Sequence, residues 1–151
     1  MEMRARLRVL VRERCQRTGH RDHTMAGSLT ELSDATFDET IGASSGPVLV
    51  DFWAEWCGPC RAYAPVFERV SEEFPDVVFA KVDTEVEQAL AGSFGIRSIP
   101  TTIAFKEGIG VFMQPGALPE EALKDLIAKL QDLDMDEVRA ELEARESEDI
   151  A

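Results

Sequence analysis

Apolar residues recur along this chain with two different spacings, and the alternation between them predicts alternating strands and helices. Short β-branched and aromatic runs predict strands at residues 29–32, 48–54, 77–82, 102–106 and 111–113, the last two joined as a hairpin through residues 107–110. Helical spacing predicts helices at residues 57–74, 86–94 and 118–133, and one that begins at Ser33 or Asp34 and ends in the 42–46 loop. This order indicates an α/β fold with a mixed sheet.

The first part of the chain lies outside this pattern. Residues 1–24 hold seven Arg against three acidic residues, a net charge of +4, and Arg interrupts their apolar positions too often for a signal-peptide core. We expect residues 1–27 to be a disordered basic extension. A mitochondrial transit segment and a start codon upstream of the true beginning at Met25 are the alternatives.

Residues 134–151 are predicted to form a second extension, which is acidic and helical. Asp134 followed by Glu137 is typical of a capping box at a helix start. The apolar residues of this stretch share one helical face, namely Met135, Val138 and Leu142. So short a stripe fits either a helix docked on the domain or on a partner, or a solvated helix with frayed ends.

Charge and composition narrow the function further. The formal net charge is −13, so the residues beyond 24 carry −17, which argues against nucleic acid as a partner. No apolar run approaches the ~20 residues of a membrane-spanning helix, and no membrane anchoring is expected. Cys15, His20 and His23 lie in the basic segment at a spacing that fits no strong metal-ligand pattern. We therefore predict no metal site and, with three cysteines, no disulfide scaffold.

Cys57 and Cys60 stand where the strongest predicted strand gives way to a helix. At this spacing Cys57 falls at the helix start and Cys60 one turn later on the same face, so the two sulfurs can meet. The helix N-terminus favours a thiolate at Cys57. The pair is predicted to cycle between dithiol and disulfide, with Cys57 as nucleophile and Cys60 as resolving thiol. Zinc is disfavoured because a second ligand pair of suitable spacing is absent from the sequence.

Residues 51–60 (DFWAEWCGPC), with Ile96, the Ile-Pro-Thr run at 99–101 and Gly116, closely resemble the thioredoxin family. The resemblance extends over residues 28–132, and we take 28–133 as one thioredoxin domain. It implies the thioredoxin fold, a central mixed β-sheet with helices on both faces. It also implies a protein-disulfide reductase that maintains the redox balance of the cell by dithiol–disulfide exchange.

The two residues between the cysteines indicate whether the pair reduces or oxidises its substrates. Gly58 allows a substrate backbone to approach closely, and Pro59 pre-sets a helical backbone angle and stiffens the bridge. The Gly-Pro pair resembles the reducing members of the family. Oxidising and isomerising relatives usually carry His before the second cysteine, where an imidazolium would stabilise the thiolate and make the disulfide more oxidising.

The resemblance also implies a substrate-binding surface. Pro100 matches the cis-proline of the family, which faces the cysteine pair. A substrate would add as a short strand along Ile99 and Gly116, with Trp56 and Pro59 as its apolar surround.

Two residues of this surface depart from the family pattern. Ser98 stands where many relatives have Gly, a small change. Pro115 precedes Gly116 in a predicted edge strand, where proline is tolerated, and we expect it to alter the neighbouring groove.

Asp51 lies inside the most apolar strand, so burial should raise the pKa of its carboxyl group. The resemblance implies that Asp51 exchanges a proton with Cys60. A hydrogen-bonded structural Asp is the alternative. Lys81 matches the lysine that neighbours this Asp in thioredoxins and would moderate the shift, although its position in the strand fits an exposed side chain equally well.

These features favour a cytoplasmic, monomeric thioredoxin that acts on disulfide-containing proteins. It would bind no cofactor and would receive electrons from NADPH through a flavoprotein, thioredoxin reductase. An oxidase or isomerase of an oxidising compartment is the second hypothesis, opposed by the Gly-Pro bridge and the missing signal peptide. A non-catalytic chaperone or assembly subunit is the third, and its binding would survive the loss of both Cys57 and Cys60.

Overall fold

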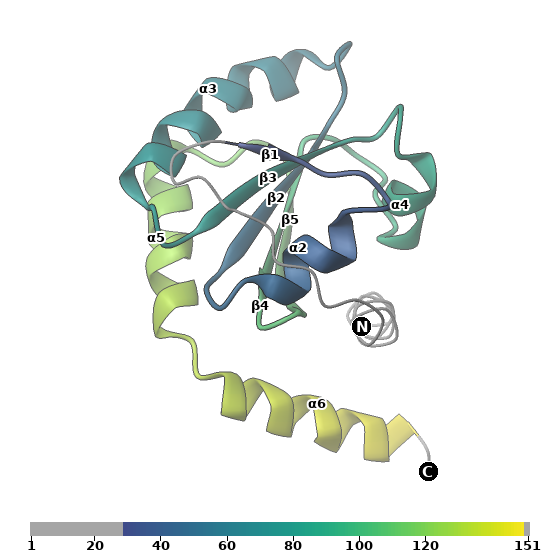
Figure 1. The fold of residues 1–151 in the computed structure, drawn as a ribbon, viewed down its shortest axis with the longest axis vertical. Helices are drawn as coiled ribbons and strands as arrows, with labels where there is room; N and C mark the ends of the chain where they lie inside the picture. The colour runs from purple at the N-terminus through teal and green to yellow at the C-terminus, as the bar shows by residue number, and fades with distance from the viewer. Residues whose placement is uncertain (1–28, 150–151) are drawn as a thin grey trace.

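The computed structural model describes residues 29–149, which form a five-stranded sheet with helices around it (Figure 1). The strands are β1 (Thr30–Glu31), β2 (Val48–Trp53), β3 (Val78–Asp83), β4 (Thr101–Lys106) and β5 (Ile109–Pro115). The helices are α2 (Phe37–Ala43), α3 (Gly58–Glu73), α4 (Gln88–Ser93), α5 (Glu120–Asp132) and α6 (Met135–Asp149). The α/β class and the mixed sheet are confirmed.

The strands follow the order β1-β3-β2-β4-β5 across the sheet, which puts β2 at its centre. β2 runs parallel to β3, to which the α3 crossover joins it, and antiparallel to β4. The tight hairpin between β4 and β5 makes that pair antiparallel as well. In this register Asp51 lies opposite Lys81 on one side and opposite Thr102 on the other. Side chains directly opposite in neighbouring strands share one face, so these three residues lie on the same face of the sheet.

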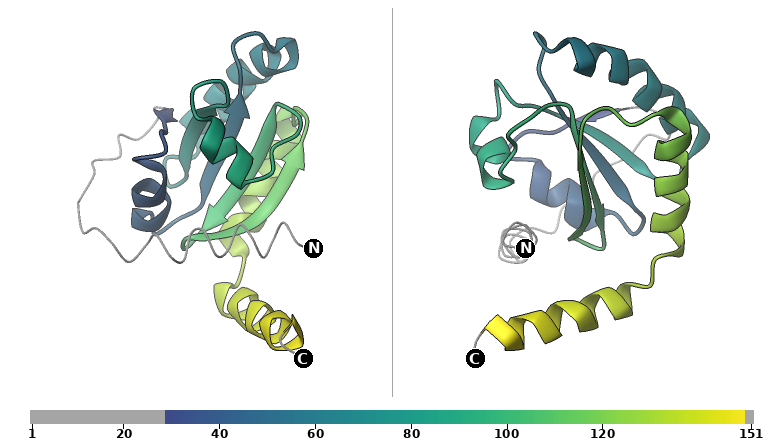
Figure 2. Two further views of the ribbon diagram at one scale, coloured as in Figure 1. Left: turned by 90° about the vertical axis from the view of Figure 1, so that its right-hand side faces the viewer. Right: turned by 180° about the vertical axis from the view of Figure 1, so that it is seen from behind.

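Side chains alternate between two hydrophobic cores, one on each face of the sheet. Val48, Val50 and Phe52 of β2 belong to the core beneath α2 and α4, whereas Leu49 belongs to the core beneath α3 and α5. Figure 2 shows helices on both faces of the sheet. The strand is therefore buried on both faces, as its continuous apolar run predicts.

Two predicted boundaries are wrong for local reasons. α2 begins at Phe37 rather than at Ser33 or Asp34, because Ser33 and Thr36 bond each other's backbone N–H through their hydroxyls and close a separate turn first. The β4–β5 hairpin turns on two residues rather than four. Glu107 and Gly108 both have positive φ, the combination that a two-residue type I′ turn requires, so Ile109 already pairs with Lys106.

The predicted C-terminal helix is present as α6, which extends away from the sheet beyond the end of α5 (Figures 1 and 2). Asp134 Oδ1 accepts the N–H groups of Asp136 and Glu137 and caps its first turn. Met135 is buried, and Arg139 pairs with Glu107 in the hairpin turn at 2.7 Å. The start of α6 therefore docks on the domain, while the residues beyond Leu142 are exposed as far as Glu148.

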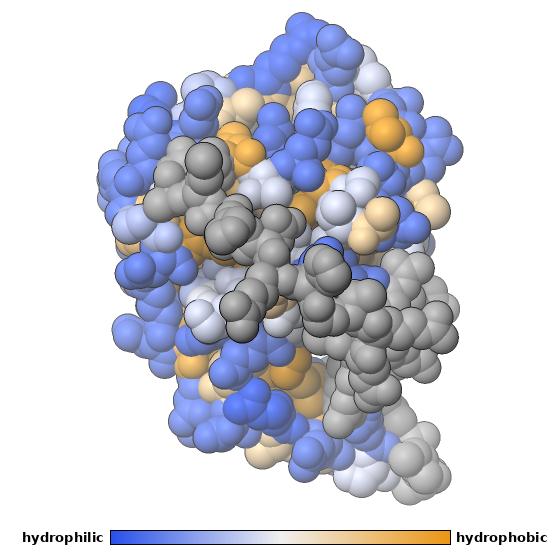
Figure 3. All heavy atoms as spheres, viewed as in Figure 1, coloured by the Kyte–Doolittle hydropathy of each residue, from blue (hydrophilic) through white to orange (hydrophobic). Residues whose placement is uncertain are grey.

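The face shown in Figure 3 is mostly hydrophilic, with small scattered hydrophobic patches. Within residues 29–149, no helix is both long and apolar enough to cross a membrane. The predictions for residues 1–27, including those for Cys15, His20 and His23, lie outside the described part of the chain.

Candidate active site

Cys57 and Cys60 meet at the start of α3, where they form a disulfide with their Cα atoms 5.2 Å apart. Cys57 is the N-cap residue of the helix, and its Sγ accepts the backbone N–H of Cys60 at 3.2 Å. An N–H donor and the positive end of a helix both stabilise negative charge on sulfur. Cys57 is therefore placed to hold a thiolate once the disulfide is reduced.

The loop before β4 lies against this pair. The Ile99–Pro100 peptide bond is cis, which confirms the predicted geometry of Pro100, whereas its contact with substrate stays a prediction. Cys57 Sγ lies 3.7 Å from the carbonyl oxygen of Ile99, so the two segments touch although they are 42 residues apart in sequence. Gly116 has φ of 91° and donates its N–H to the carbonyl of Pro100 at 2.7 Å. That N–H is bonded within the domain, and a Cβ added to Gly116 would meet nothing within 4 Å.

The rim of the site is open. Trp56 is 68% exposed, and its indole N–H donates to Glu85 at 2.8 Å, which fixes the ring beside the cysteines. Gly58 and Pro59 are exposed at the first turn of α3, and a Cβ added to Gly58 would meet nothing within 4 Å. The space above Gly58 is therefore open, and the domain's own packing does not require glycine there.

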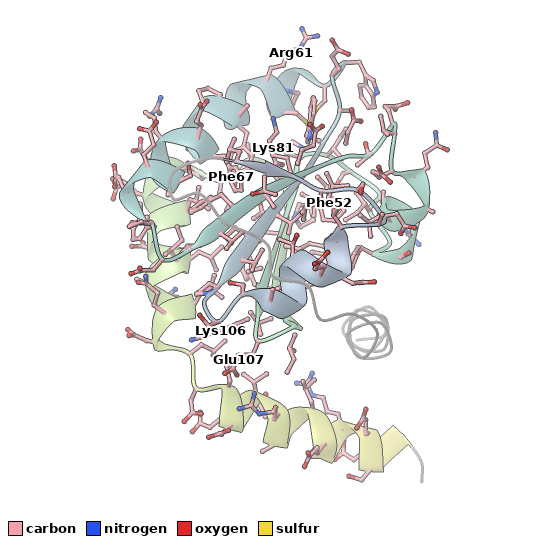
Figure 4. The ribbon with its side chains drawn as sticks, viewed as in Figure 1. Phe52, Arg61, Phe67, Lys81, Lys106 and Glu107 are labelled. Atoms are coloured by element: carbon pink, nitrogen blue, oxygen red, sulfur yellow. A yellow bond between two sulfur atoms is a disulfide. The ribbon has the colours of Figure 1, made fainter. Side chains whose placement is uncertain are left out.

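Asp51 is 1% exposed, and its Oδ1 has no hydrogen-bond partner among residues 29–149. Burial raises the pKa of Asp51 to about 7, and the charge of Lys81 offsets part of that rise. Lys81 is half-buried, with its Nζ 4.4 Å from the centre of the Trp53 ring. Figure 4 shows Lys81 near the centre of the sheet and Arg61 at the far upper edge of α3. Asp51 can thus gain or lose a proton near neutral pH.

Two hydroxyl groups beside Asp51 were not expected from the sequence. Tyr63 is fully buried on the same face of α3 as Cys60, and its hydroxyl bonds the Thr102 hydroxyl at 2.9 Å. The signal that was available is the spacing, since Tyr63 lies three residues after Cys60 and four before Phe67.

No group of three or more His, Cys, Asp and Glu side chains that could hold a metal ion is present within residues 29–149. The described site presents two sulfurs, one carboxyl group and the surrounding backbone.

Comparison with known proteins places this geometry in context. The family model for thioredoxin matches residues 28–129. A relative in Streptomyces coelicolor, whose name puts it among the thioredoxins, is 54% identical over 112 residues, which are 74% of this chain and 83% of the relative. Thioredoxin 1 of Synechococcus elongatus is 46% identical over 99 residues, or 65% of this chain and 92% of that protein.

Solved structures agree with this result. A thioredoxin variant from Halobacterium salinarum superposes with a TM-score of 0.67 at 34% identity, over 75% of this chain and 99% of the other. Thioredoxin f from spinach chloroplast gives a TM-score of 0.66 at 36% identity, over 71% and 97% of the two chains. The fold and the Cys-Gly-Pro-Cys site define a dithiol–disulfide exchange protein. This chain belongs to the thioredoxin family and is a protein-disulfide oxidoreductase with a redox-active cysteine pair.

Proposed function

We propose that this protein works as a cytoplasmic reductase of disulfides in other proteins, with Cys57 as nucleophile and Cys60 as resolving thiol. The observation that carries this proposal is the placement of the pair. Cys57 caps α3 beside the carbonyl of Ile99, and the bridge between the cysteines consists of Gly58 and Pro59, with no imidazole to stabilise the thiolate further. A less stabilised thiolate corresponds to a more reducing couple.

The reaction divides into two exchanges that balance. The Cys57 thiolate attacks one sulfur of the substrate disulfide, forms a mixed disulfide and releases the other substrate sulfur as a thiolate. The Cys60 sulfur then attacks Cys57 Sγ and breaks the bond between Cys57 and the substrate. The substrate leaves with both sulfurs reduced, and the two electrons that it has gained come from the cysteine pair, which closes as the disulfide.

Asp51 serves the second exchange as proton acceptor. Cys60 must lose its thiol proton before it attacks, and a carboxylate with pKa of about 7 can accept that proton near neutral pH and later return it. Lys81 supports this role because its charge keeps the pKa of Asp51 from rising further. Without that ammonium group, a larger fraction of Asp51 would stay protonated and unable to act as a base.

Substrate binds across the open rim of the site. Trp56 and Pro59 flank the cysteines on one side, while Ile99, Pro100 and Gly116 form a backbone edge on the other. An extended substrate segment would lie along this edge as a short strand. Pro115 pairs with Thr101 at the end of the edge strand β5. This rigid residue alters the adjacent groove and thereby narrows the range of substrates that the protein accepts.

The oxidised protein needs a source of two electrons. We assign this role to thioredoxin reductase, a flavoprotein that draws on NADPH. The chain would then bind no cofactor of its own. It would act as a monomer. Residues 28–133 would carry the activity, and residues 134–151 would be an acidic appendage outside the catalytic domain.

The first test is the equilibrium potential of the Cys57–Cys60 couple in defined thiol buffers. Trp53 and Trp56 adjoin the site and report its redox state by fluorescence. A potential near −270 mV supports the reductase, whereas one of about −120 to −180 mV points to oxidative folding. A protein that does not titrate, yet still binds its partners without Cys57 and Cys60, would support the non-catalytic hypothesis instead.

A second assay tests recycling and direction together. Insulin reduction is followed with NADPH and thioredoxin reductase supplied in catalytic amount. Steady NADPH consumption that depends on this protein supports the assigned partner. Insulin reduction with a chemical dithiol but none with the reductase would leave the chemistry intact and overturn the recycling partner alone.

A further inference from the structure

Tyr63 and Thr102 form a buried hydroxyl pair that disulfide exchange itself does not use. Tyr63 is 1% exposed and Thr102 0%, and their oxygen atoms lie 2.9 Å apart. The Tyr63 ring packs against Phe67 at 5.7 Å between ring centres, which holds its hydroxyl in place. Burial raises the pKa of Tyr63 above its usual value, so its phenol stays protonated and neutral wherever the protein is folded.

This pair is adjacent to Asp51 from two directions. Thr102 is the residue directly opposite Asp51 in the β2–β4 pairing, so the two side chains share one face of the sheet. Tyr63 reaches the same face from α3, one turn after Cys60, and the Asp51 charge acts on its phenol. The hydroxyl pair, the carboxyl group and the resolving cysteine therefore converge beneath the start of α3.

The hydrogen-bond donors and acceptors of this cluster are not all paired with one another. Two hydroxyls carry two hydrogens, and the bond between them uses one. Asp51 Oδ1 is a buried acceptor with no donor among residues 29–149, so the second hydroxyl hydrogen is not bonded to it in this arrangement. Buried polar groups in folded proteins are nearly always paired, and a catalytic role is one explanation for an acceptor that is buried without a donor.

We propose that the Tyr63–Thr102 pair is a positioning device that turns its uncommitted hydroxyl hydrogen toward the Asp51 carboxylate, and thereby sets the pH at which Asp51 accepts the proton of Cys60. When Asp51 is ionised, the hydroxyl dipole stabilises the charge. When Asp51 is protonated, the hydrogen turns away. The consequence for turnover rests on the proton-accepting role proposed above for Asp51, whereas the effect on Asp51 itself does not.

The charged and titratable groups that face Asp51 determine the sign of the effect. Lys81 on β3 favours the carboxylate, and the cysteines of α3 do not titrate while they form the disulfide. The buried residues of α5 are apolar, and β4 contributes the Thr102 hydroxyl. Removing a hydroxyl donor leaves burial less opposed, so the pKa of Asp51 must rise.

A matched pair of substitutions at one position tests the proposal. Thr102→Val keeps the shape of the side chain and removes the hydroxyl, whereas Thr102→Ser keeps the hydroxyl. The Asp51 carboxyl is titrated by ¹³C NMR in the oxidised full-length protein, where neither cysteine contributes. We expect its midpoint to rise by about half a pH unit or more in Thr102→Val and to stay at the wild-type value in Thr102→Ser.

Tyr63→Phe provides a second, independent variant, with Ser71→Ala as its control. Ser71 carries another buried hydroxyl group on α3. Its hydrogen-bond partner is the carbonyl of Glu68 rather than Tyr63, Thr102 or Asp51. Tyr63→Phe should raise the Asp51 midpoint as Thr102→Val does, and the double variant should raise it no further, because the pair acts as a unit. Ser71→Ala should leave it unchanged.

A purely structural pair gives a different result. The variants would then lose stability while the Asp51 midpoint stays at the wild-type value, and the proposal would be wrong. In the reduced enzyme the acid limb of the pH–rate profile should move upward by the same amount, a loss of about threefold at a fixed pH on that limb. If Asp51 shifts but this limb does not, the hydroxyl pair acts on Asp51 as proposed and the proton-accepting role of Asp51 fails.

Discussion

Two polar residues of the central strands, Lys106 and Asp51, show how differently this fold treats its polar groups. Lys106, at the end of β4, donates from Nζ to the carbonyls of Leu130, Gln131 and Leu133 at the C-terminus of α5. Asp51, toward the other end of the adjacent strand, has an oxygen with no partner among residues 29–149. Figure 4 shows Lys106 and Glu107 beside the start of α6, far from Lys81.

The contacts of Lys106 serve the stability of the fold, whereas the surroundings of Asp51 serve its chemistry. The Lys106 ammonium satisfies carbonyls that the end of a helix leaves unpaired and complements the helix dipole, so its three bonds stabilise one arrangement. Asp51 is held where ionisation is disfavoured, which costs stability and leaves its proton exchangeable. Substitutions at the Lys106 end should therefore change stability alone, and substitutions at the Asp51 end should change catalysis, stability or both.

The largest expected effect is on turnover at the cysteine pair. Cys57→Ser should lower the rate of insulin reduction by at least about a thousandfold, because the attacking thiolate is lost. Cys60→Ser should instead accumulate mixed disulfides between Cys57 and substrate, visible on non-reducing gels. If both variants keep wild-type turnover, the assigned roles are wrong.

Asp51→Asn should sharpen the comparison through its dependence on pH. The pKa of Asp51 is about 7 when folded and about 4 when unfolded, so the folded protein binds more protons in between and loses stability as pH rises from 4 to 7. Asn avoids this loss. The variant should gain up to about 4 kcal/mol in unfolding free energy at pH 8, relative to its difference from wild type at pH 4.

Denaturant unfolding at the two pH values measures this gain, and the same preparation should reduce insulin more slowly at pH 7 because Cys60 has lost its base. Equal shifts at pH 4 and pH 8 would contradict the raised pKa, since an effect of packing alone does not depend on the ionisation of Asp51.

Lys106→Met should act in the opposite way. It removes three donors from the end of α5 and should lower the unfolding free energy by about 1–3 kcal/mol, measured by urea denaturation. Turnover per folded molecule should stay at the wild-type level, because the cysteine pair lies at the other end of the sheet. A loss of turnover with unchanged stability would contradict the division made here.

Arg139→Ala should have the smallest effect. Arg139 pairs with Glu107 and Asp136 at 2.7 Å, but all three side chains are well exposed to solvent. Exposed ion pairs contribute little, so the midpoint of thermal unfolding should change only slightly, and less in high salt. A large decrease would show that α6 contributes to domain stability through this contact.

Local sequence patterns predicted most of the elements but not all of their ends. The apolar run of β2 and the stripe of α3 are strong because each is continuous over several residues. The hairpin turn was misjudged because Glu107 adopts positive φ, which glutamate rarely does and which only the pairing of β4 with β5 imposes. Likewise, Ser33 resembles a helix cap, but its reciprocal bonds with Thr36 end in a turn.

The sequence by itself determined the chemistry of this protein. A Cys-Gly-Pro-Cys run at a strand-to-helix boundary specifies a redox pair at a helix N-terminus, because the helix repeat alone brings Cys57 and Cys60 together. The tertiary structure decided what surrounds that pair. Tyr63, Thr102 and Lys81 converge on Asp51 only through strand register and helix packing. These contacts join residues that are 30 to 51 positions apart, and no local pattern encodes a distance in space between residues so far apart in sequence.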